Sequence, residues 1–190
     1  MKKSGVRTVK RRRRENRTDY LSRLKLLKSE RPRIVFRKTN RYLLAQYVVS
    51  KEAQDKIEFG ISSKILLKHG WPKEAEGSLK SIPAAYLTGF AMGKKIVENK
   101  LEPPIVDFGM LRTLNKTKLY GFLKGLIDSG IKIPCSEEAF PDEKRITGEN
   151  LKNKIKFDEI KRSLLSVPET SGTRTSEKVP AKSKNEGVKL

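Results

Sequence analysis

Lysine and arginine are the residues in this chain best suited to do chemistry, and they gather before residue 42. Residues 1–41 hold 17 Lys and Arg against 3 Asp and Glu, so this part alone carries +14 of the formal net charge of +21. Such a stretch neutralises phosphates and releases the counterions around them. Arginine adds a planar fork that binds phosphate and stacks on bases. The uneven charge predicts a basic arm on a milder domain that binds nucleic acid.

A predicted β-hairpin positions several of these cations. The segments 34–36 and 42–49 are rich in β-branched and aromatic residues, which indicates two antiparallel strands. The link between them, residues 37–41, holds three cations, and Asn40 suits a left-handed turn position. The plain interpretation is a solvated turn whose charges prevent edge pairing. The basic segment before the hairpin favours a surface that meets an anion.

Three tyrosines, Tyr20, Tyr42 and Tyr47, lie among or beside these cations. Their rings can stack on bases, and their hydroxyl groups can form hydrogen bonds. No predicted helix has the layout of a major-groove reader. RNA, whose unpaired bases stack on aromatic side chains, therefore suits this mixture of residues better than DNA.

The elements around the predicted hairpin must position its cations and those of the basic segment before it. Residues 1–17 hold nine Lys and Arg with only Val6 and Val9 as sizeable apolar residues, so we expect them to be disordered in the free protein. Thr18 or Asp19 is suited to cap the helix that follows. The apolar face of that helix is predicted to consist of Tyr20, Leu24 and Leu27.

The rest of the pattern predicts an α/β fold with a mixed sheet. Residues 56–61 alternate as a third antiparallel strand with one solvated face. A helix from Ser81 to about Glu98 carries Ala85, Gly89 and Gly93 every fourth residue, which indicates close approach of another backbone, and we expect that backbone to be the sheet. A strand at 105–108, a helix with an apolar stripe over 119–127 and a strand at 131–133 follow, and this strand–helix–strand unit implies a parallel pair with a right-handed crossover.

The predicted architecture is an antiparallel three-stranded meander plus the strand–helix–strand unit, with flanking helices that end in an amphipathic helix through Phe157 and Leu165. We expect a basic RNA-binding arm at 1–17, a single globular domain at 18–165 and a disordered tail at 166–190. No apolar segment follows the basic N-terminus and no apolar run approaches the roughly 20 residues of a membrane span, so we expect a soluble protein.

The sequence gives little support for a catalytic site or a metal site. The sequence has no glycine-rich phosphate loop. Asp107, Asp128, Asp142 and Glu143 can be drawn as a two-metal nuclease cluster, but scattered surface and capping carboxylates are the favoured interpretation. Cys135 is the single cysteine, which fits a reducing compartment, and His69 is expected at a helix end. These two residues alone cannot form a structural zinc site. Trp71 is favoured as a core residue over a stacking surface for a base.

Several segments resemble a known family. RPRIVFRKTNRYLLAQ is similar to the hairpin of the L-eighteen family of large-subunit ribosomal proteins, which bind 5S ribosomal RNA. The similarity runs from about Val6 to Leu165, while Cys135 stands where a polar residue or His is expected and the chain after Val167 is not a shared feature. The segments that resemble the archaeal and eukaryotic branch are RRRRENRTDYLSRLKLLKS, IPAAYLTGFAMGKK, DFGMLRTLNKTKLYGFLKGLIDSGIKIP, SEEAFPDEKRITGENL and FDEIKRSLL, and the size fits an archaeal protein.

The resemblance implies a concrete function. Members of this family bind 5S rRNA and help to dock it into the central protuberance of the large ribosomal subunit. They also contact large-subunit rRNA, an L-five family protein and other large-subunit proteins. It also implies a ribonuclease-H-like shape without catalysis, no cofactor, no membrane or small-molecule partner, and a place in the cytoplasmic ribosome. The RNA contacts would come from Arg7, Lys10, Arg11, Arg12, Arg13, Arg14, Arg17, Tyr20, Arg23, Arg33, Arg37, Lys38, Asn40, Arg41 and Tyr42.

Two other functions stay open at this point. One is a metal-dependent nucleic-acid enzyme with Asp107, Asp128 and Asp142 as its site. The other is a general RNA-binding protein or chaperone that uses only the basic arm.

Overall fold

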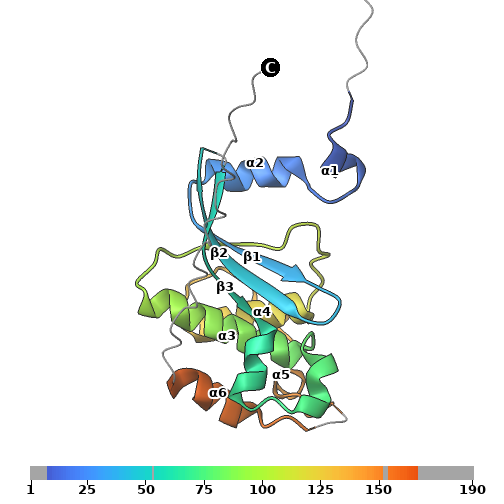
Figure 1. The fold of residues 1–190 in the computed structure, drawn as a ribbon, viewed down its shortest axis with the longest axis vertical. Coiled ribbons are helices and arrows are strands. Elements are labelled where there is room, and N and C mark those ends of the chain that lie inside the picture. Colours follow the sequence, from blue (N-terminus) through green and yellow to red (C-terminus); the bar gives the residue numbers. More distant parts are fainter. Residues whose placement is uncertain (1–7, 53, 152–153, 167–190) are drawn as a thin grey trace, which may run out of the picture.

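The computed structural model describes residues 8–52, 54–151 and 154–166, and it contains a mixed four-stranded sheet between two groups of helices (Figure 1). The strands β1 and β2 form the expected hairpin, β3 continues the meander, and β4 pairs with β1 in parallel. The order across the sheet is β3-β2-β1-β4. This confirms the predicted α/β class, and the predicted tail lies almost wholly outside the described residues. The strands are β1 (Arg33–Lys38), β2 (Leu43–Lys51), β3 (Gln54–Ser62) and β4 (Ile105–Asp107).

Several helical elements begin or end at residues whose chemistry predicts it. Asp19 accepts hydrogen bonds from the backbone N–H groups of Leu21 and Ser22, and Ser81 caps its helix through Ala84. Gly70 ends a 3₁₀ segment with a φ of 97°. No helix among the described residues has the length and apolar character to cross a membrane. The helical elements are α1 (Arg11–Arg14), α2 (Tyr20–Lys28), η1 (Ser63–His69), η2 (Lys73–Ser78), α3 (Ile82–Glu98), α4 (Lys118–Asp128), η3 (Glu137–Ala139), α5 (Glu143–Thr147) and α6 (Phe157–Ser166).

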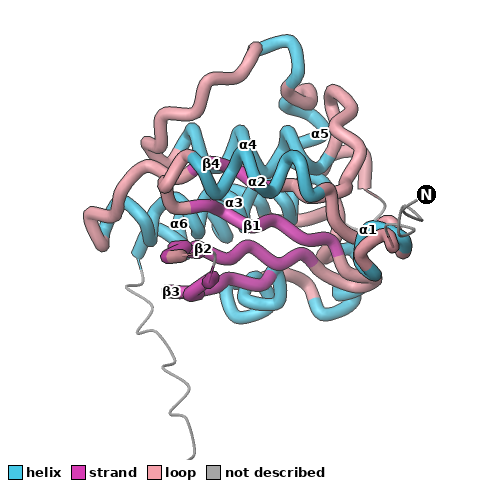
Figure 2. Tube along the Cα trace, turned by 90° about the horizontal axis from the view of Figure 1, so that it is seen from above, coloured by secondary structure: helices cyan, strands magenta, loops and turns pink. Residues whose placement is uncertain are grey.

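The two faces of the sheet differ in what covers them. Figure 2 shows the strands side by side with α3 and α4 alongside, whereas Figure 1 shows α1 and α2 apart from the other helices, beyond the opposite side of the sheet. The core between the sheet and the helices α3 and α4 is apolar, and α2 contributes no fully buried residue. Leu24, expected on the packed face of α2, is half exposed. The buried side chains of this core include Ile34, Phe36, Ala45, Tyr47, Met92, Phe122 and Leu126.

The hairpin turn is closed by Thr39 rather than by a left-handed Asn40. The Thr39 hydroxyl donates to the Tyr42 carbonyl at 2.6 Å and accepts from the Tyr42 N–H at 3.0 Å, and the Thr39 N–H donates to the same carbonyl at 2.9 Å. Asn40 does not have a positive φ. The expectation of a left-handed Asn40 was wrong because a side-chain hydroxyl supplies the contacts that close the turn.

The third strand does not alternate as cleanly as its sequence predicts. Tyr47 pairs with Phe59 but the next residue, Val48, pairs with Ile57, so Glu58 is an extra residue on β3. This β-bulge turns Ile57 away from the side chains that face α3. Ile57 is consequently 53% exposed, whereas Ile61 remains buried.

The glycines of α3 allow close approach of α4, not of the sheet. A Cβ atom on Gly89 would overlap the Phe122 carbonyl of α4, and a Cβ atom on Gly125 would overlap the Tyr86 carbonyl of α3. The glycines therefore do lie close to another backbone, but the expectation that this backbone is the sheet was wrong. The small residues lie on the flank of α3, where a second helix backbone fits more closely than side chains would allow.

The predicted strand at 131–133 is absent from the sheet that the structure describes. The Ile131 N–H instead bonds to the Leu126 carbonyl at 3.3 Å and so helps to close the C-terminal end of α4. Ile131 is still buried in the core. The parallel pair is β1 with β4, and the chain between these strands passes through β2, β3 and α3.

A second core holds the C-terminal helix. Trp71 is 2% exposed and its indole N–H donates to the Ala75 carbonyl at 3.0 Å, which confirms that it is a core residue. His69 closes η1, as expected, and its Nδ1 lies 2.9 Å from the Ser163 hydroxyl of α6. Phe157, Ile160 and Leu164 of α6 are buried in this cluster.

Candidate nucleic-acid interface

Arg33 lies at the centre of a buried polar network on the sheet face nearest to α2. Its side chain is 2% exposed, and its guanidinium donates to Asp55 at 2.7 Å and to Ser50 at 2.8 Å. The Asp107 carboxylate lies 4.0 Å from the same group. Arg33 was expected to contact RNA, and this stays a prediction that the geometry does not favour, because the guanidinium is buried and already paired with carboxylates.

Asp55 connects this network to the N-terminal helix. It also accepts from Arg23 of α2 at 3.1 Å, so one carboxylate lies between Arg23 and Arg33. Partial burial acts to raise the pKa of Asp55, but the hydrogen bond from Ser50 and the charges of Arg33 and Arg23 outweigh it and leave the pKa below its ordinary value. α2 is therefore attached to the sheet by an ion pair.

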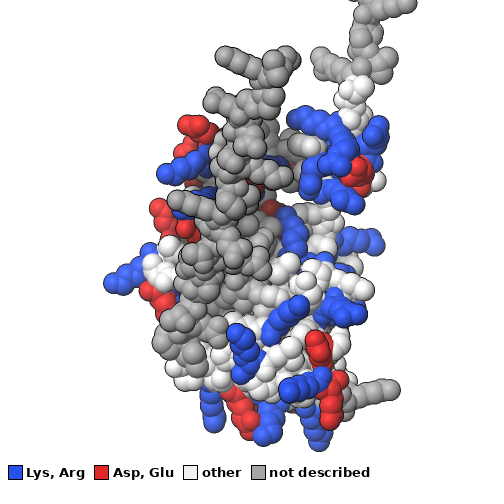
Figure 3. Space-filling model, viewed as in Figure 1, with Lys and Arg blue, Asp and Glu red and all other residues white. Residues whose placement is uncertain are grey.

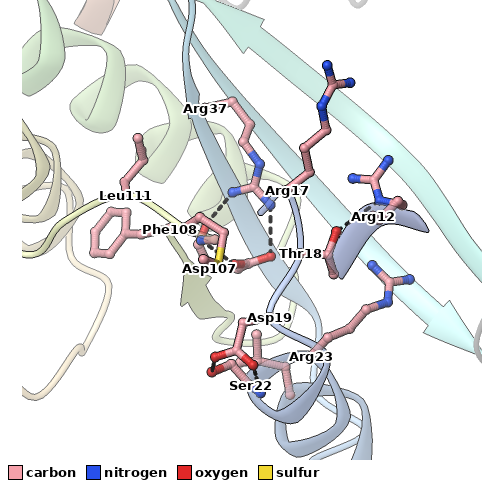
Figure 4. Close-up of a pocket in the computed structure, with 13 residues that line it drawn as sticks. Arg12, Arg17, Thr18, Asp19, Ser22, Arg23, Arg37, Asp107, Phe108 and Leu111 are labelled. Carbon is pink, nitrogen blue, oxygen red and sulfur yellow. Dashed lines mark hydrogen bonds and ion pairs between the residues drawn. The ribbon is translucent and has the colours of Figure 1, made fainter. Parts of the chain in front are cut away.

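A surface hollow of about 290 Å³ lies between α2, the segment before it and the end of β4 (Figure 4). Arg37 forms part of the lining of this hollow. The Arg37 guanidinium donates to the Phe36 and Asp107 carbonyls at 2.8 and 3.0 Å and to the Asp107 carboxylate at 3.2 Å. Its side chain is nevertheless 44% exposed. The charged residues of the lining are Arg12, Arg17, Asp19, Arg23, Arg37 and Asp107, so cations outnumber carboxylates by two to one.

The described part of the arm presents its cations to solvent. Arg11 and Arg17 both lie near Glu15, at 3.7 and 3.5 Å, yet their side chains are 74% and 71% exposed. Exposed pairs of this kind contribute little to stability, so these cations are free to exchange Glu15 for phosphate. Arg12 donates to the Thr18 hydroxyl at 2.9 Å. Arg13 and Arg14 complete the helical turn α1, and Arg7 lies outside the described residues.

Tyrosines meet cations at both ends of this surface. Lys10 lies over the Tyr20 ring at 4.6 Å, and Lys64 lies over the Tyr42 ring at 4.7 Å. These are cation–π contacts, so one face of each ring lies against a lysine. Tyr47 is buried in the core, and its hydroxyl donates to the Glu102 carbonyl at 3.0 Å.

The loop end of the hairpin forms a second exposed basic surface. Lys38, Asn40 and Arg41 are exposed, and the Asn40 carbonyl accepts from Lys80 at 2.8 Å. Figure 3 shows Lys and Arg side chains over α1 and again over this end of the hairpin. Lys80 was not among the residues predicted from the sequence, because only the fold places it beside the turn. Asp55 was missed for a similar reason, since its role depends on the pairing of β2 with β3.

The carboxylates considered as a nuclease cluster lie in separate places with separate partners. Asp107 pairs with Arg37, Asp142 with Lys116 at 3.3 Å, and Asp128 with Lys124 at 3.2 Å. Asp128 also accepts from Tyr86 at 2.7 Å, and burial followed by this contact raises the pKa of Tyr86. Within the described ranges, no group of three or more His, Cys, Asp or Glu could hold a metal ion. The nuclease alternative therefore loses its site.

The sequence of this chain is similar to those of ribosomal proteins. A family model described as "Ribosomal large subunit proteins 60S L5, and 50S L18" matches residues 4–103. The "Large ribosomal subunit protein uL18" of Korarchaeum cryptofilum is 43% identical over 152 residues, which are 80% of this chain and 76% of the relative. The protein of the same name from Methanothrix thermoacetophila is 37% identical over 150 residues, or 79% and 86% of the two chains. The family match includes the basic arm from residue 4, the hairpin and α3.

Proposed function

Because this chain belongs to the family of large-subunit ribosomal proteins that includes 50S L18 and 60S L5, we propose that it binds 5S rRNA and docks it into the central protuberance of that subunit. As a family member it is a structural, non-enzymatic component of the cytoplasmic ribosome, with rRNA and ribosomal proteins as partners. We further propose that an L-five family protein is one of the neighbours. The general RNA chaperone remains the second candidate.

The observation that carries this proposal is the pair of exposed basic surfaces formed by the arm and by the loop end of the hairpin. The arm offers arginines that are more than two-thirds exposed, such as Arg11 and Arg17. The loop end offers Lys38 and Arg41, which no carboxylate pairs with in the described part of the chain. Phosphate contacts from the arm supply affinity, and contacts from a fixed turn supply orientation.

The proposed contact surface follows from exposure. It omits Arg33, whose guanidinium is buried against Asp55. Arg23 and Arg37 stay in it because each is at least 40% exposed despite its ion pair. We also propose that residues 1–17 act as the arm and 18–165 as one RNA-binding domain. The proposed RNA contacts are Arg7, Lys10, Arg11, Arg12, Arg13, Arg14, Arg17, Tyr20, Arg23, Arg37, Lys38, Asn40, Arg41 and Tyr42.

A competition experiment tests this function. The full chain is bound to labelled 5S rRNA and then challenged with unlabelled 5S rRNA or with a scrambled RNA of equal length and composition. We expect 5S rRNA to compete at least about tenfold better, which corresponds to about 1.4 kcal/mol. Equal competition would instead support the general RNA-binding protein. Recovery of 5S rRNA with the protein from its own cell extract is the complementary measurement.

A further inference from the structure

Three lysines converge at the loop end of the hairpin and form what we name the lysine cluster: Lys38, Lys80 and Lys118. Lys38 is the last residue of β1, and Lys118 is the first residue of α4. Lys80 precedes α3 and donates to the Asn40 carbonyl at 2.8 Å, which fixes it beside the turn. The three residues come from distant parts of the sequence, and nothing in their local spacing associates them.

A ring contact in the core shows why Lys38 and Lys118 face each other. Phe36 of β1 and Phe122 of α4 have ring centroids 4.5 Å apart. Lys38 lies two residues after Phe36 and therefore on the same face of the strand. Lys118 lies four residues before Phe122 and therefore on the same side of the helix, one turn closer to its start. Both lysines thus extend beyond the same aromatic contact toward the edge of the core.

The lysine cluster lacks negative partners. In the part of the chain that the structure describes, no carboxylate forms an ion pair with any of its three members. Lys116 and Lys124, on either side of Lys118 in sequence, are paired with Asp142 and Asp128 respectively. Partial burial lowers the pKa of Lys118, and the positive charges of Lys38 and Lys80 lower it further. Three like charges held together in this way favour the binding of an anion.

We propose that the lysine cluster binds a backbone phosphate of RNA. The proposal rests on the proposed function and adds a fixed phosphate site that includes Lys80 and Lys118. Lysine suits this role as a point charge with several donors, since a phosphate oxygen accepts from more than one ammonium group. Such a contact orients the RNA strand across the turn and α4 without reading its bases.

The start of α4 adds to the positive potential at this site. The Thr117 hydroxyl donates to the Leu114 carbonyl at 2.7 Å and does not cap the helix. The positive end of the helix dipole therefore lies beside Lys118 without a neutralising side chain. A phosphate held by the lysine cluster would be favoured by this dipole as well.

The test is a salt series of binding to 5S rRNA with two charge-matched double variants. Lys80→Gln with Lys118→Gln removes two members of the lysine cluster. Lys100→Gln with Lys132→Gln removes two exposed lysines from the opposite end of the α3–α4 pair. We expect the slope of log affinity against log salt to flatten by up to about 0.7 to 0.9 in the first variant, since the loss of one neutralised phosphate removes about that much from the slope. The second variant should keep the parental slope within experimental error.

Each result of this experiment either supports or overturns the proposed phosphate site. An unchanged slope in the cluster variant would overturn the proposed phosphate site. The lysine cluster would then be expected to bind an acidic protein surface instead of RNA. Equal flattening in both variants would also overturn it, because net charge alone would then explain the effect. If the cluster variant does not fold, Lys38→Gln at the exposed member should flatten the slope in the same direction, by up to about 0.7 to 0.9. Failure of the parent chain to prefer 5S rRNA over scrambled RNA refutes the proposed function separately, since the slope comparison does not depend on that preference.

Discussion

Arg33 and Asp55 form a 2.7 Å ion pair although their strands, β1 and β3, are not neighbours in the sheet. The guanidinium reaches across β2, where Ser50 bonds to both partners at 2.8 and 2.6 Å. Asp55 then binds Arg23 of α2 at 3.1 Å. One buried cation therefore connects three strands and the first helix of the domain, and it does so beneath the surface proposed to meet RNA.

Replacing Asp55 should destabilise the fold. Asp55→Asn leaves Arg33 buried without its main partner, and breaking a buried ion pair costs about 3–5 kcal/mol. We expect the lower end of this range, because Asp55 is about one-third exposed and Asp107 lies 4.0 Å from Arg33. Urea unfolding at pH 7 measures the effect. Glu138→Gln, an exposed change of the same charge, is the control and should change stability by less than about 0.5 kcal/mol.

The same pair predicts a pH dependence of stability. The folded-state pKa of Asp55 lies below its ordinary value of 3.8, so the carboxylate binds protons less readily in the folded than in the unfolded chain. Its stabilising contribution is therefore complete above that ordinary value and is lost as the pH falls through the lower, folded pKa. The difference in unfolding free energy between the parent and Asp55→Asn should be constant near neutral pH and shrink below about pH 3.8. A difference that grows in acid would contradict this assignment.

Gly125→Ala should destabilise the protein although alanine is the better helix former. The gain in helix propensity is about 1 kcal/mol, but the new methyl group would overlap the Tyr86 carbonyl of α3. Separating the two backbones costs about 1–3 kcal/mol or more by the usual scale of overpacking, so we expect a net loss in thermal unfolding. Gly77→Ala, where no atom lies within 4 Å of the added carbon, is the control and should not lower the melting temperature.

Trp71 should report on folding but not on RNA binding. It is the single tryptophan of the chain, and its buried ring has its N–H bonded to the Ala75 carbonyl. Its fluorescence emission maximum should therefore stay constant when 5S rRNA is added to saturation, and shift to longer wavelength on unfolding in urea. Strong quenching by RNA before any unfolding would mean that Trp71 stacks on a base.

The arm and the hairpin should contribute differently to RNA binding. The arm variant replaces Arg11, Arg12, Arg13 and Arg14 with Ala and removes up to four cations that neutralise phosphates, so its salt slope should flatten by about 0.7 to 0.9 for each such cation. The hairpin variant, Asn40→Ala with Arg41→Ala, alters two exposed residues on a fixed turn. It should reduce the preference for 5S rRNA over scrambled RNA more than it changes the slope. If the arm variant alone loses that preference, the arm is the specific reader and the two roles are reversed.

Much of the fold could be predicted because many of its determinants are local. The caps at Asp19 and Ser81, the stop at Gly70 and the apolar stripe of α4 each depend on residues within a few positions of one another. Errors arose where another hydrogen bond or packing contact outweighed the pattern of the sequence. Residues 131–133 alternate like a strand, but there the Ile131 N–H closes the end of α4.

The proposed RNA-binding surface also depends partly on local sequence and partly on tertiary structure. The sequence by itself determined that the chain is basic at its N-terminus, that a hairpin follows, and that the family is ribosomal, because charge and short motifs are properties of neighbouring residues. Only the tertiary structure decided which cations remain available. Arg33 and Arg41 look alike in sequence, yet the first is buried on Asp55 and the second is exposed. Strand register and helix packing bring together residues far apart in the chain, and burial, which sets the energy of a charge, depends on that packing.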